Sequence, residues 1–343
     1  MVQTAITDTL RPLSDQMGRF TATIAFLAVL LLFGAPPGSE AAGTAPRVAI
    51  LCVPSCSGTT FEALLDELRN LGWVENATIV LERKEAGSRL DQLPVFAADL
   101  VRSKPDLIVA FTPQAVRAVK DATSDIPIVM LFVADPVGVG LASSLAHPGG
   151  NLTGVATLVP GAFMGKMLEV LRELLPHAKR VAAFLNPSSE TLRLLFPREA
   201  PAAAAKLGFE LDIINVKETN EIPGAVAAAK AGGAEALWIV GDPIFHSPPH
   251  RVPDLAAQAG LPSIYLVRNL VQAGGLISYG PDFPGEARRG AHYIDRILKG
   301  AKPADLPIEQ PAKYLLAINL KTAKSLGVEI PPSLLARADE VFE

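Results

Sequence analysis

The chain has 343 residues, of which 49% are apolar and 19% charged, so it is long enough for two domains with substantial cores. Its formal net charge of −4, with no basic cluster, excludes the electrostatic footprint of a nucleic-acid-binding protein. The excess of alanine, leucine and valine favours parallel sheets covered by helices on both faces.

The first expected element is an apolar run at residues 20–33, preceded by Arg11 and Arg19. This run is shorter than the roughly 20 residues that a membrane-spanning helix needs. Small residues follow in Ser39-Glu40-Ala41, so we predict a secretory signal peptide over 1–41, cleaved after Ala41. An uncleaved anchor is the alternative. Neither cysteine stands just after the run, so a lipid anchor is not expected.

Two stretches share one construction, an apolar strand that ends in a Pro-Ser turn. They are Arg47–Ser57 and Arg180–Ser189, and both open with Arg-Val-Ala. After each come a helix ending at glycine, a strand reaching a polar-Pro corner and a further strand that begins at an apolar-Pro pair. This order of landmarks predicts two similar lobes.

Strands and helices alternate along the rest of the chain. Up to the first interruption we expect strands at 48–53, 77–82, 107–111 and 128–133, and helices at 59–71, 90–101 and 113–122. In the second copy we expect strands from 180 and at 210–216, 237–240 and 263–266, and helices at 163–175, 200–207, 222–230 and 255–259. The last part of the chain should add helices at 286–298 and 320–326 and a strand after 314.

Three interruptions predict crossings between the lobes: the glycine-rich segments 147–154 and 274–280, and the proline-rich segment 303–311. The expected fold is α/β, with two doubly wound parallel-sheet lobes joined by a multi-strand hinge. Lobe 1 would contain 46–153 plus 281–310, and lobe 2 would contain 154–280 plus 311–343. Ligands bind outside the carboxyl ends of such strands, so a cleft between the lobes is expected.

Polar residues at the predicted strand ends are candidate ligand contacts. Thr112-Pro113-Gln114 opens a helix, whose N-terminus favours an anion, although simple capping by Thr112 is also expected. Asp135 and Asp242 stand at Asp-Pro corners and either could pair with an ammonium group, or simply start a turn. The remaining candidates, each with a capping or core alternative, are Ser55, Ser57, Asn186, Ser188, Tyr265 and Tyr279.

The two cysteines, Cys52 and Cys56, stand four residues apart across the first turn. We expect Cys52 to be a buried small apolar residue on its strand, and Cys56 could be free. An exported protein meets an oxidising compartment, so a disulfide is the alternative, although it requires a tight backbone. The spacing does not match a zinc site.

The sequence offers little for catalysis. His246 and His250 have a helical metal-pair interval, but Pro248-Pro249 between them prevents a regular helix. No Gly-X-Ser-X-Gly elbow occurs, and no phosphate-binding glycine motif follows a predicted strand. We therefore expect no catalytic residues, no metal and no cofactor.

Beyond these local patterns, a set of stretches spread along the chain carries a resemblance to a known family: residues 135–138, 148–154, 241–243, 273–280, 297–307, 318–324 and 330–339. In their order and spacing they resemble the periplasmic substrate-binding proteins of ABC transporters, in the tryptophan/tyrosine-type group. The first-strand turn, Cys52-Val-Pro-Ser-Cys56, departs from that group.

The resemblance implies a monomeric, periplasmic, non-enzymatic protein. It would capture a small molecule, such as an amino acid, by hinge closure and deliver it to ABC permease subunits and their ATPase in the inner membrane. Two alternatives remain: an exported two-lobed α/β hydrolase or transferase, and a ligand-sensing module for a membrane receptor.

Overall fold

The structure is a computed structural model that describes residues 45–343 except 88, 160, 162, 247 and 312. The predicted signal peptide at 1–41 lies outside these residues. Within the described part of the chain, no helix combines the length and apolar character needed to cross a membrane.

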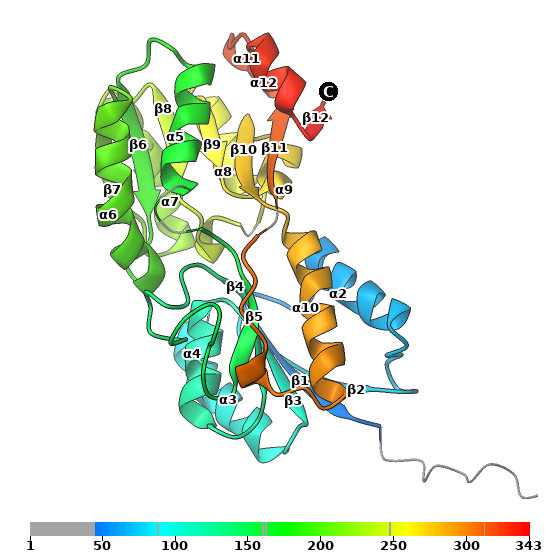
Figure 1. Ribbon diagram of the computed structural model, residues 1–343. Coiled ribbons are helices and arrows are strands. Elements are labelled where there is room, and N and C mark those ends of the chain that lie inside the picture. The colour runs from blue at the N-terminus through cyan, green and yellow to red at the C-terminus, as the bar shows by residue number, and fades with distance from the viewer. Residues whose placement is uncertain (1–44, 88, 160, 162, 247, 312) are drawn as a thin grey trace, which may run out of the picture. The chain divides into compact units, whose positions relative to one another are not determined.

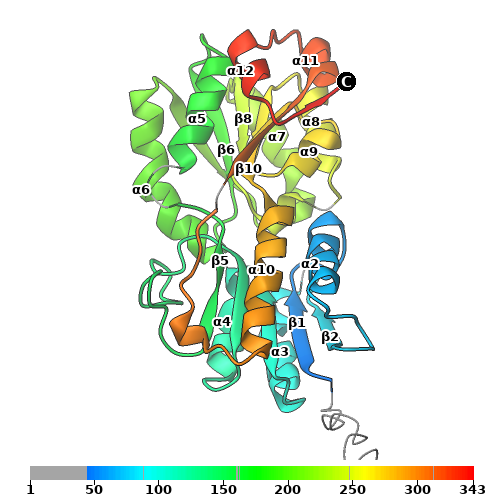
Figure 2. The ribbon, with the colours of Figure 1, turned by 45° about the vertical axis from the view of Figure 1, so that its right-hand side comes forward.

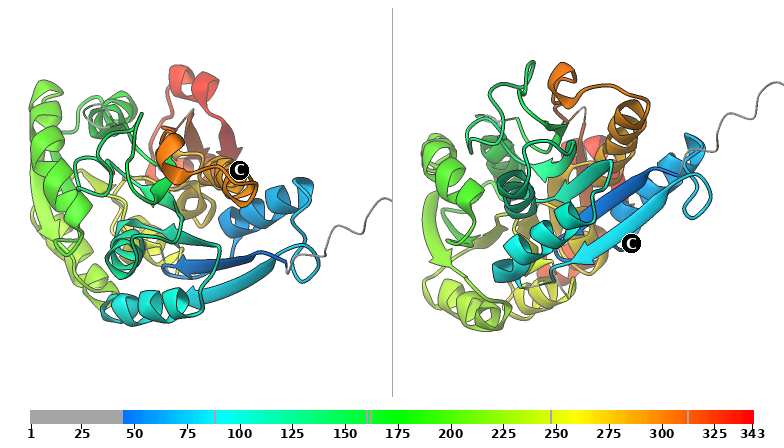
Figure 3. Two further views of the ribbon diagram at one scale, coloured as in Figure 1. Left: turned by 60° about the horizontal axis from the view of Figure 1, so that its bottom comes forward. Right: turned by 90° about the horizontal axis from the view of Figure 1, so that it is seen from below.

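The first sheet is wholly parallel, with strand order β2-β1-β3-β4-β5. Two helices cover each of its faces: α2 and α10 pack on one side, and α3 and α4 on the other (Figures 1 and 3). The strands are β1 (Arg47–Cys52), β2 (Val80–Glu85), β3 (Leu107–Phe111), β4 (Ile128–Val133) and β5 (Leu152–Ala156). The helices are α2 (Thr59–Asn70), α3 (Leu93–Arg102), α4 (Pro113–Ala122) and α10 (Phe283–Leu298), and the short helix η1 (Leu90–Gln92) leads into α3.

The second sheet has the order β12-β11-β10-β9-β8-β6-β7 and is parallel except where β10 pairs with β11. Its strands are β6 (Arg180–Leu185), β7 (Glu210–Asn215), β8 (Ala236–Ile239), β9 (Ser263–Tyr265), β10 (Ile277–Pro281), β11 (Tyr314–Asn319) and β12 (Glu340–Phe342). Its helices are α5 (Phe163–Leu174), α6 (Glu190–Lys206), α7 (Ile222–Ala231), α8 (Arg251–Gln258), α9 (Arg268–Gln272), α11 (Leu320–Leu326) and α12 (Pro332–Arg337). The expected class, two mostly parallel α/β lobes, is confirmed.

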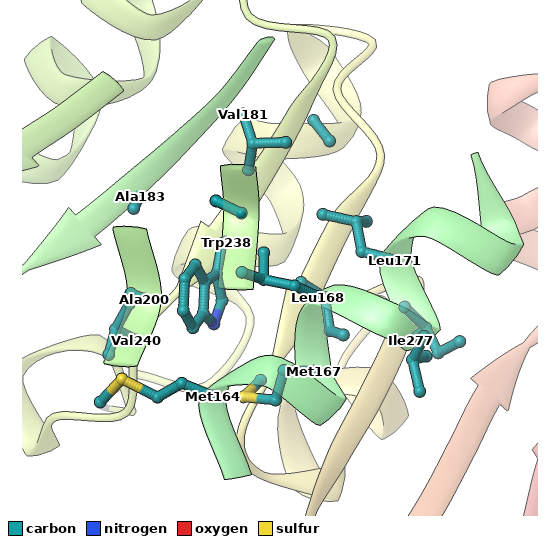
Figure 4. Close-up of a cluster of buried hydrophobic side chains, with 14 of the residues drawn as sticks. Met164, Met167, Leu168, Leu171, Val181, Ala183, Ala200, Trp238, Val240 and Ile277 are labelled. Atoms are coloured by element: carbon teal, nitrogen blue, oxygen red, sulfur yellow. The ribbon is translucent and has the colours of Figure 1, made fainter. Parts of the chain in front are cut away.

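The core of the second lobe shows why the apolar side chains of the predicted helix at 163–175 recur at helical spacing. Met164, Met167, Leu168 and Leu171 recur along one side of α5 and pack against the sheet beside Trp238 of β8 (Figure 4). All of these side chains are at most 3% exposed. The apolar stripe of α5 therefore covers one face of the sheet, and burial of this apolar area stabilises the lobe.

The chain passes between the lobes three times: after β5, between β10 and α10, and before β11 (Figures 1 and 2). The last passage contains the short helix η4 (Pro303–Asp305), and its Glu309 pairs with Val155 of β5. Helix α10 follows a strand of the second sheet but packs against α2, β4 and β5 of the first lobe. Both lobes are thus built from separated segments of sequence.

The first crossing lies later than residue 153, where the sequence boundary was expected. Residues 152–156 form β5 within the first sheet, so the chain leaves this sheet after Ala156. The misleading residue is Gly154, whose φ is 140° and whose missing Cβ would lie 2.1 Å from the carbonyl oxygen of Met130. Glycine here permits close approach of two strands, whereas the sequence pattern had indicated a linker.

Candidate functional site

A cavity of about 320 Å³ lies where the carboxyl ends of strands from both sheets meet. Residues at or just beyond the ends of β1, β3, β4 and β5 line it from the first lobe, and those of β8, β9 and β10 from the second. This is the expected place for a ligand site in doubly wound sheets. Of the candidates chosen from sequence, the cavity is lined by Ser55, Ser57, Thr112, Pro113, Gln114 and Asp242.

The turn after β1 is closed by a disulfide between Cys52 and Cys56, so the expectation that Cys52 is only a buried apolar residue was wrong. Cys52 is also fully buried, as expected. The two Cα atoms lie 5.3 Å apart, within the ordinary range for a disulfide. The closed turn carries the hydroxyls of Ser55 and Ser57, whose Oγ atoms are 2.8 Å apart, at the rim of the cavity.

Reducing this disulfide is expected to destabilise the protein by about 2 kcal/mol, the loop-closure value for so short a ring. The measurement is thermal unfolding with and without a phosphine reductant, with Cys52→Ala/Cys56→Ala as the control. The double variant should already unfold at the lower temperature and should not respond to the reductant. An unchanged midpoint on reduction of the wild type would contradict the expectation.

Thr112 starts α4 but does not cap it through its side chain, contrary to simple capping. Its hydroxyl is buried and has no hydrogen-bond partner among the described residues. The backbone adopts a φ of 79°, which is an outlier for a β-branched residue. An N-terminus with free N–H groups, next to an unpartnered hydroxyl at the cavity wall, favours an anionic group.

The second lobe offers a matching helix start. Ser189 caps α6 through a long contact to the N–H of Leu192 (3.5 Å), and Thr191 in the first turn lines the cavity. The Thr191 hydroxyl is buried and likewise has no partner in the described part of the protein. Two helix N-termini, one from each lobe, therefore border the same cavity.

Asp242 follows β8 and is only 4% exposed. Its carboxylate accepts hydrogen bonds from Asn186 Nδ2 and from the N–H of Ile244, both at 3.1 Å. Burial raises the pKa of Asp242, and these two hydrogen bonds oppose the rise only in part. No ion pair of the described residues involves Asp242, so it presents a buried carboxylate without a cation at the cavity wall.

Asn186 and Ser188 take part in this arrangement without lining the cavity. The amide oxygen of Asn186 accepts the N–H of Ser188 at 2.9 Å, which fixes the amide so that its NH₂ group points to Asp242. The Ser188 side chain is exposed. Asn186 thus orients the carboxylate of Asp242, whereas the sequence analysis had predicted that Asn186 contacts the ligand itself.

The other three candidates lie elsewhere. Asp135 closes a turn by accepting the N–H of Gly138 at 2.8 Å. Tyr265 is fully buried, and its hydroxyl is 2.7 Å from Ser263 Oγ. Tyr279 packs in a cluster of three rings with Phe163 and Tyr314, which also contact each other. None of the three lines the cavity.

Sequence reasoning did not place several further polar residues on the wall, among them the ionisable His246 and Arg268. Burial lowers the pKa of His246 to about 4, so its imidazole is neutral at pH 7. The guanidinium of Arg268 forms an ion pair with Glu340 of β12. Neither group forms an ion pair with Asp242 in the described part of the chain.

The wall also contains the aromatic rings of Phe61, Phe111, Phe132 and Phe283. The first three come from the first lobe, and Phe283 opens α10 directly after the second crossing. In the structure its ring is only half-buried.

The fold matches proteins of known structure. A crystal structure of a conserved domain protein from Vibrio cholerae is 27% identical, with a TM-score of 0.81 over 87% of this chain and 99% of that one. A protein from Streptococcus pneumonia in complex with L-Trp is 26% identical, with a TM-score of 0.80 over the same shares. A tyrosine-binding protein of Clostridioides difficile is 25% identical over 268 residues, 78% of this chain and 76% of that protein.

The family described as ABC transporter substrate binding protein matches residues 49–342, which include every strand end that borders the cavity. Because this match covers nearly the whole described chain, the protein belongs to the ABC transporter substrate-binding protein family.

Proposed function

We propose that this protein captures a free amino acid in the cavity and delivers it to an ABC permease. The observation that carries the proposal is Asp242, a buried carboxylate that has no ion-pair partner among the described residues. The ammonium group of an amino acid would supply the missing positive charge. The helix N-termini at Thr112 and Thr191 would receive the carboxylate of the same molecule.

The comparisons support an amino acid rather than a sugar. One relative is described as tyrosine-binding, and a solved relative contains L-Trp. Each lobe contributes part of the cavity wall, so a ligand that contacts both lobes holds them together. The chain then acts by binding alone, as a monomer exported to the periplasm, and its partners are the permease subunits and their ATPase in the inner membrane.

The test is thermal unfolding of the purified chain against matched ligands. L-Trp, L-Tyr, L-Phe and L-Leu would be compared with tryptamine, which lacks the carboxylate, and with indole-3-propionate, which lacks the ammonium group. A ligand at 100 times its dissociation constant adds about 2.7 kcal/mol to the free energy of unfolding, which shifts the midpoint by several degrees.

We expect at least one amino acid to raise the midpoint and both truncated analogues to fail at the same concentration. Recovery of the bound compound unchanged, checked by mass spectrometry, would agree with binding alone. If neither these amino acids nor a wider amino-acid panel shifts the unfolding midpoint, the proposal is refuted. Stabilisation by tryptamine equal to that by L-Trp would remove the carboxylate from the recognition scheme.

A further inference from the structure

The turn after β1 presents one side to the cavity and the other side to the core of the first lobe. Its two cysteines lie in that core, where Cys52 has no exposed surface and Cys56 is 8% exposed. The residues of the turn that line the cavity are Val53, Pro54, Ser55 and Ser57. The disulfide therefore fastens the turn from the core side and leaves its cavity side open to a ligand.

The two ends of the disulfide are held by different contacts. Cys52 is the last residue of β1, and it pairs with Glu85 in the ladder between β1 and β2. Cys56 lies outside the sheet, and its N–H donates a hydrogen bond to the Glu85 carboxylate at 2.9 Å. The carbonyl of Pro54 accepts the N–H of Gly87, also at 2.9 Å. The sheet keeps Cys52 in place with or without the disulfide, so the disulfide acts mainly on the position of the turn.

The hydroxyls of Ser55 and Ser57 are the side-chain polar groups that this turn offers to a ligand. Both residues are exposed, and their Oγ atoms lie 2.8 Å apart. Within the described part of the chain, neither hydroxyl has another hydrogen-bond partner. When one O–H donates to the other oxygen, the second O–H remains free to donate. The pair can therefore give a hydrogen bond to a carboxylate oxygen of the solute, provided that the turn holds both serines in place.

The short distance in sequence between the cysteines makes this a local constraint. They are four residues apart, and a disulfide that closes so short a loop removes less entropy from the unfolded chain than one that closes a long loop. Ser55 lies inside the closed ring, and Ser57 follows Cys56 directly. The disulfide is therefore better suited to fixing these two serines than to stabilising the whole fold.

We propose that the Cys52–Cys56 disulfide is a redox-controlled positioning element of the ligand site. In the oxidised protein it holds the hydroxyls of Ser55 and Ser57 against the solute, and in the reduced protein the turn is released and the affinity falls. The chemical partner is a dithiol. It gives two electrons and two protons, the S–S bond breaks, each cysteine becomes a thiol and the dithiol becomes a disulfide. The inference rests on the proposed amino-acid function and adds a means of regulating the same site.

The experiment is titration calorimetry of L-Trp, L-Tyr, L-Phe and L-Leu into the oxidised and the dithiothreitol-reduced wild type, below the unfolding midpoint of both. The chain has two cysteines in all, so thiol counting in denaturant should give none per chain before reduction and two after it. We expect reduction to weaken the tightest of the four ligands by roughly tenfold, the fold-change that corresponds to one hydrogen bond to a charged group. Cys52→Ala/Cys56→Ala should bind as weakly as the reduced protein and should not respond to dithiothreitol.

Ser55→Ala/Ser57→Ala separates positioning of the hydroxyls from general support of the site. In its oxidised form this variant should lose a similar factor in affinity. Reduction should then change its affinity by less than about twofold, because the groups that the disulfide positions are absent. The matched control is Ser124→Ala, since Ser124 is an exposed serine of the same lobe that does not line the cavity. It should keep both the affinity of the wild type and its response to reduction.

Equal affinities of the oxidised and reduced wild type would overturn the inference and leave the proposed function standing. The same holds for a loss on reduction that persists undiminished in Ser55→Ala/Ser57→Ala, because the disulfide would then act on the site without these hydroxyls. A natively folded, oxidised wild type that binds none of the four, nor any amino acid of the wider panel, would overturn the proposed function and the inference together.

Discussion

Asp242→Asn is expected to weaken amino-acid binding by roughly 100-fold or more while leaving the fold intact. Truncation of one partner of a buried charge pair costs about 2–5 kcal/mol, and every 1.4 kcal/mol is tenfold in affinity. Asparagine keeps the shape and an oxygen that can accept the N–H of Ile244. It removes the charge that burial penalises, so the midpoint of unfolding without ligand should not fall.

The measurement is titration calorimetry on two ligands, the best amino acid and its analogue without the ammonium group. Asp242→Asn should lose affinity for the amino acid and not for the analogue, because only the former supplies a positive charge. Asp135→Asn is the control, since Asp135 also follows a strand of a parallel sheet but does not line the cavity. Equal losses for both ligands would show that Asp242 supports the site structurally instead of pairing with an ammonium group.

The same pairing predicts a pH dependence of binding. Burial raises the pKa of Asp242, so in the free protein this carboxyl takes up a proton at a higher pH than an ordinary aspartate. Affinity for an ammonium ligand should therefore fall as the pH is lowered through that range. In Asp242→Asn the acid-side fall should disappear.

Much of the framework that places these groups was predictable from sequence, because it follows from local patterns. The strand bounds Leu107–Phe111 and Ile128–Val133 and the start of α4 at Pro113 match the predictions. Continuous apolar runs that end at a polar residue followed by proline specify both a buried strand and the start of the next element. This is why Thr112 and Asp242 were found as cavity residues.

What the sequence did not show depends on contacts between distant segments. Helix α6 begins at Glu190 rather than at 200, and it contains Pro197 and Pro201, which local rules assign to a helix boundary. Packing of Leu192, Leu195 and Phe196 into the second core overrides that rule. The short elements α9 and β12 were not predicted, because stretches of three to five residues carry too little periodicity.

The place of Phe132 on the cavity wall could not be predicted from the sequence for a related reason. Phe132 sits in an uninterrupted apolar strand, where nothing in the sequence indicates a change of backbone region. Phe132 lies within the irregularity in the pairing of β4 with β5, between Met130 and Val133. Alternating apolar residues describe which way a regular strand faces, and they fail where the strand is irregular.

Glu286→Gln is expected to stabilise the protein increasingly as the pH rises from about 5 to about 9. Glu286 lies in the first turn of α10, just after the second crossing, and is 5% exposed. No hydrogen bond of normal geometry from the described residues reaches either carboxyl oxygen. Burial raises its pKa to about 9, the charge of Asp282 adds to the rise, and the neighbouring Thr157 hydroxyl opposes it weakly.

The sign follows from proton binding. Between the ordinary value of 4.5 and about 9, the folded protein holds a proton on Glu286 that the unfolded chain has released. Unfolding therefore releases a proton, and stability falls as the pH rises through this window. The stabilisation of the fold by this proton is complete below pH 4.5. By pH 7 the loss amounts to about 3 kcal/mol, at 1.36 kcal/mol for each pH unit.

Glutamine has the same shape and no proton to release, so the comparison isolates this group. We would measure urea unfolding of the wild type, Glu286→Gln and the exposed control Glu62→Gln at intervals from pH 5 to pH 9. The difference between Glu286→Gln and wild type should grow with pH, whereas Glu62→Gln should follow the wild type. The decisive quantity is how the difference in free energy of unfolding changes with pH, because a constant difference would reflect only the extra N–H donor of glutamine.

Parallel curves would mean that Glu286 is ionised in the folded protein, with a cation or water supplying the hydrogen bonds or charge that the described residues do not provide. A rising difference would identify a protonated carboxyl at the point where the chain passes between its two lobes, next to the cavity residues Thr157 and Phe283. Ligand binding that reshapes this crossing would then be linked to proton uptake or release.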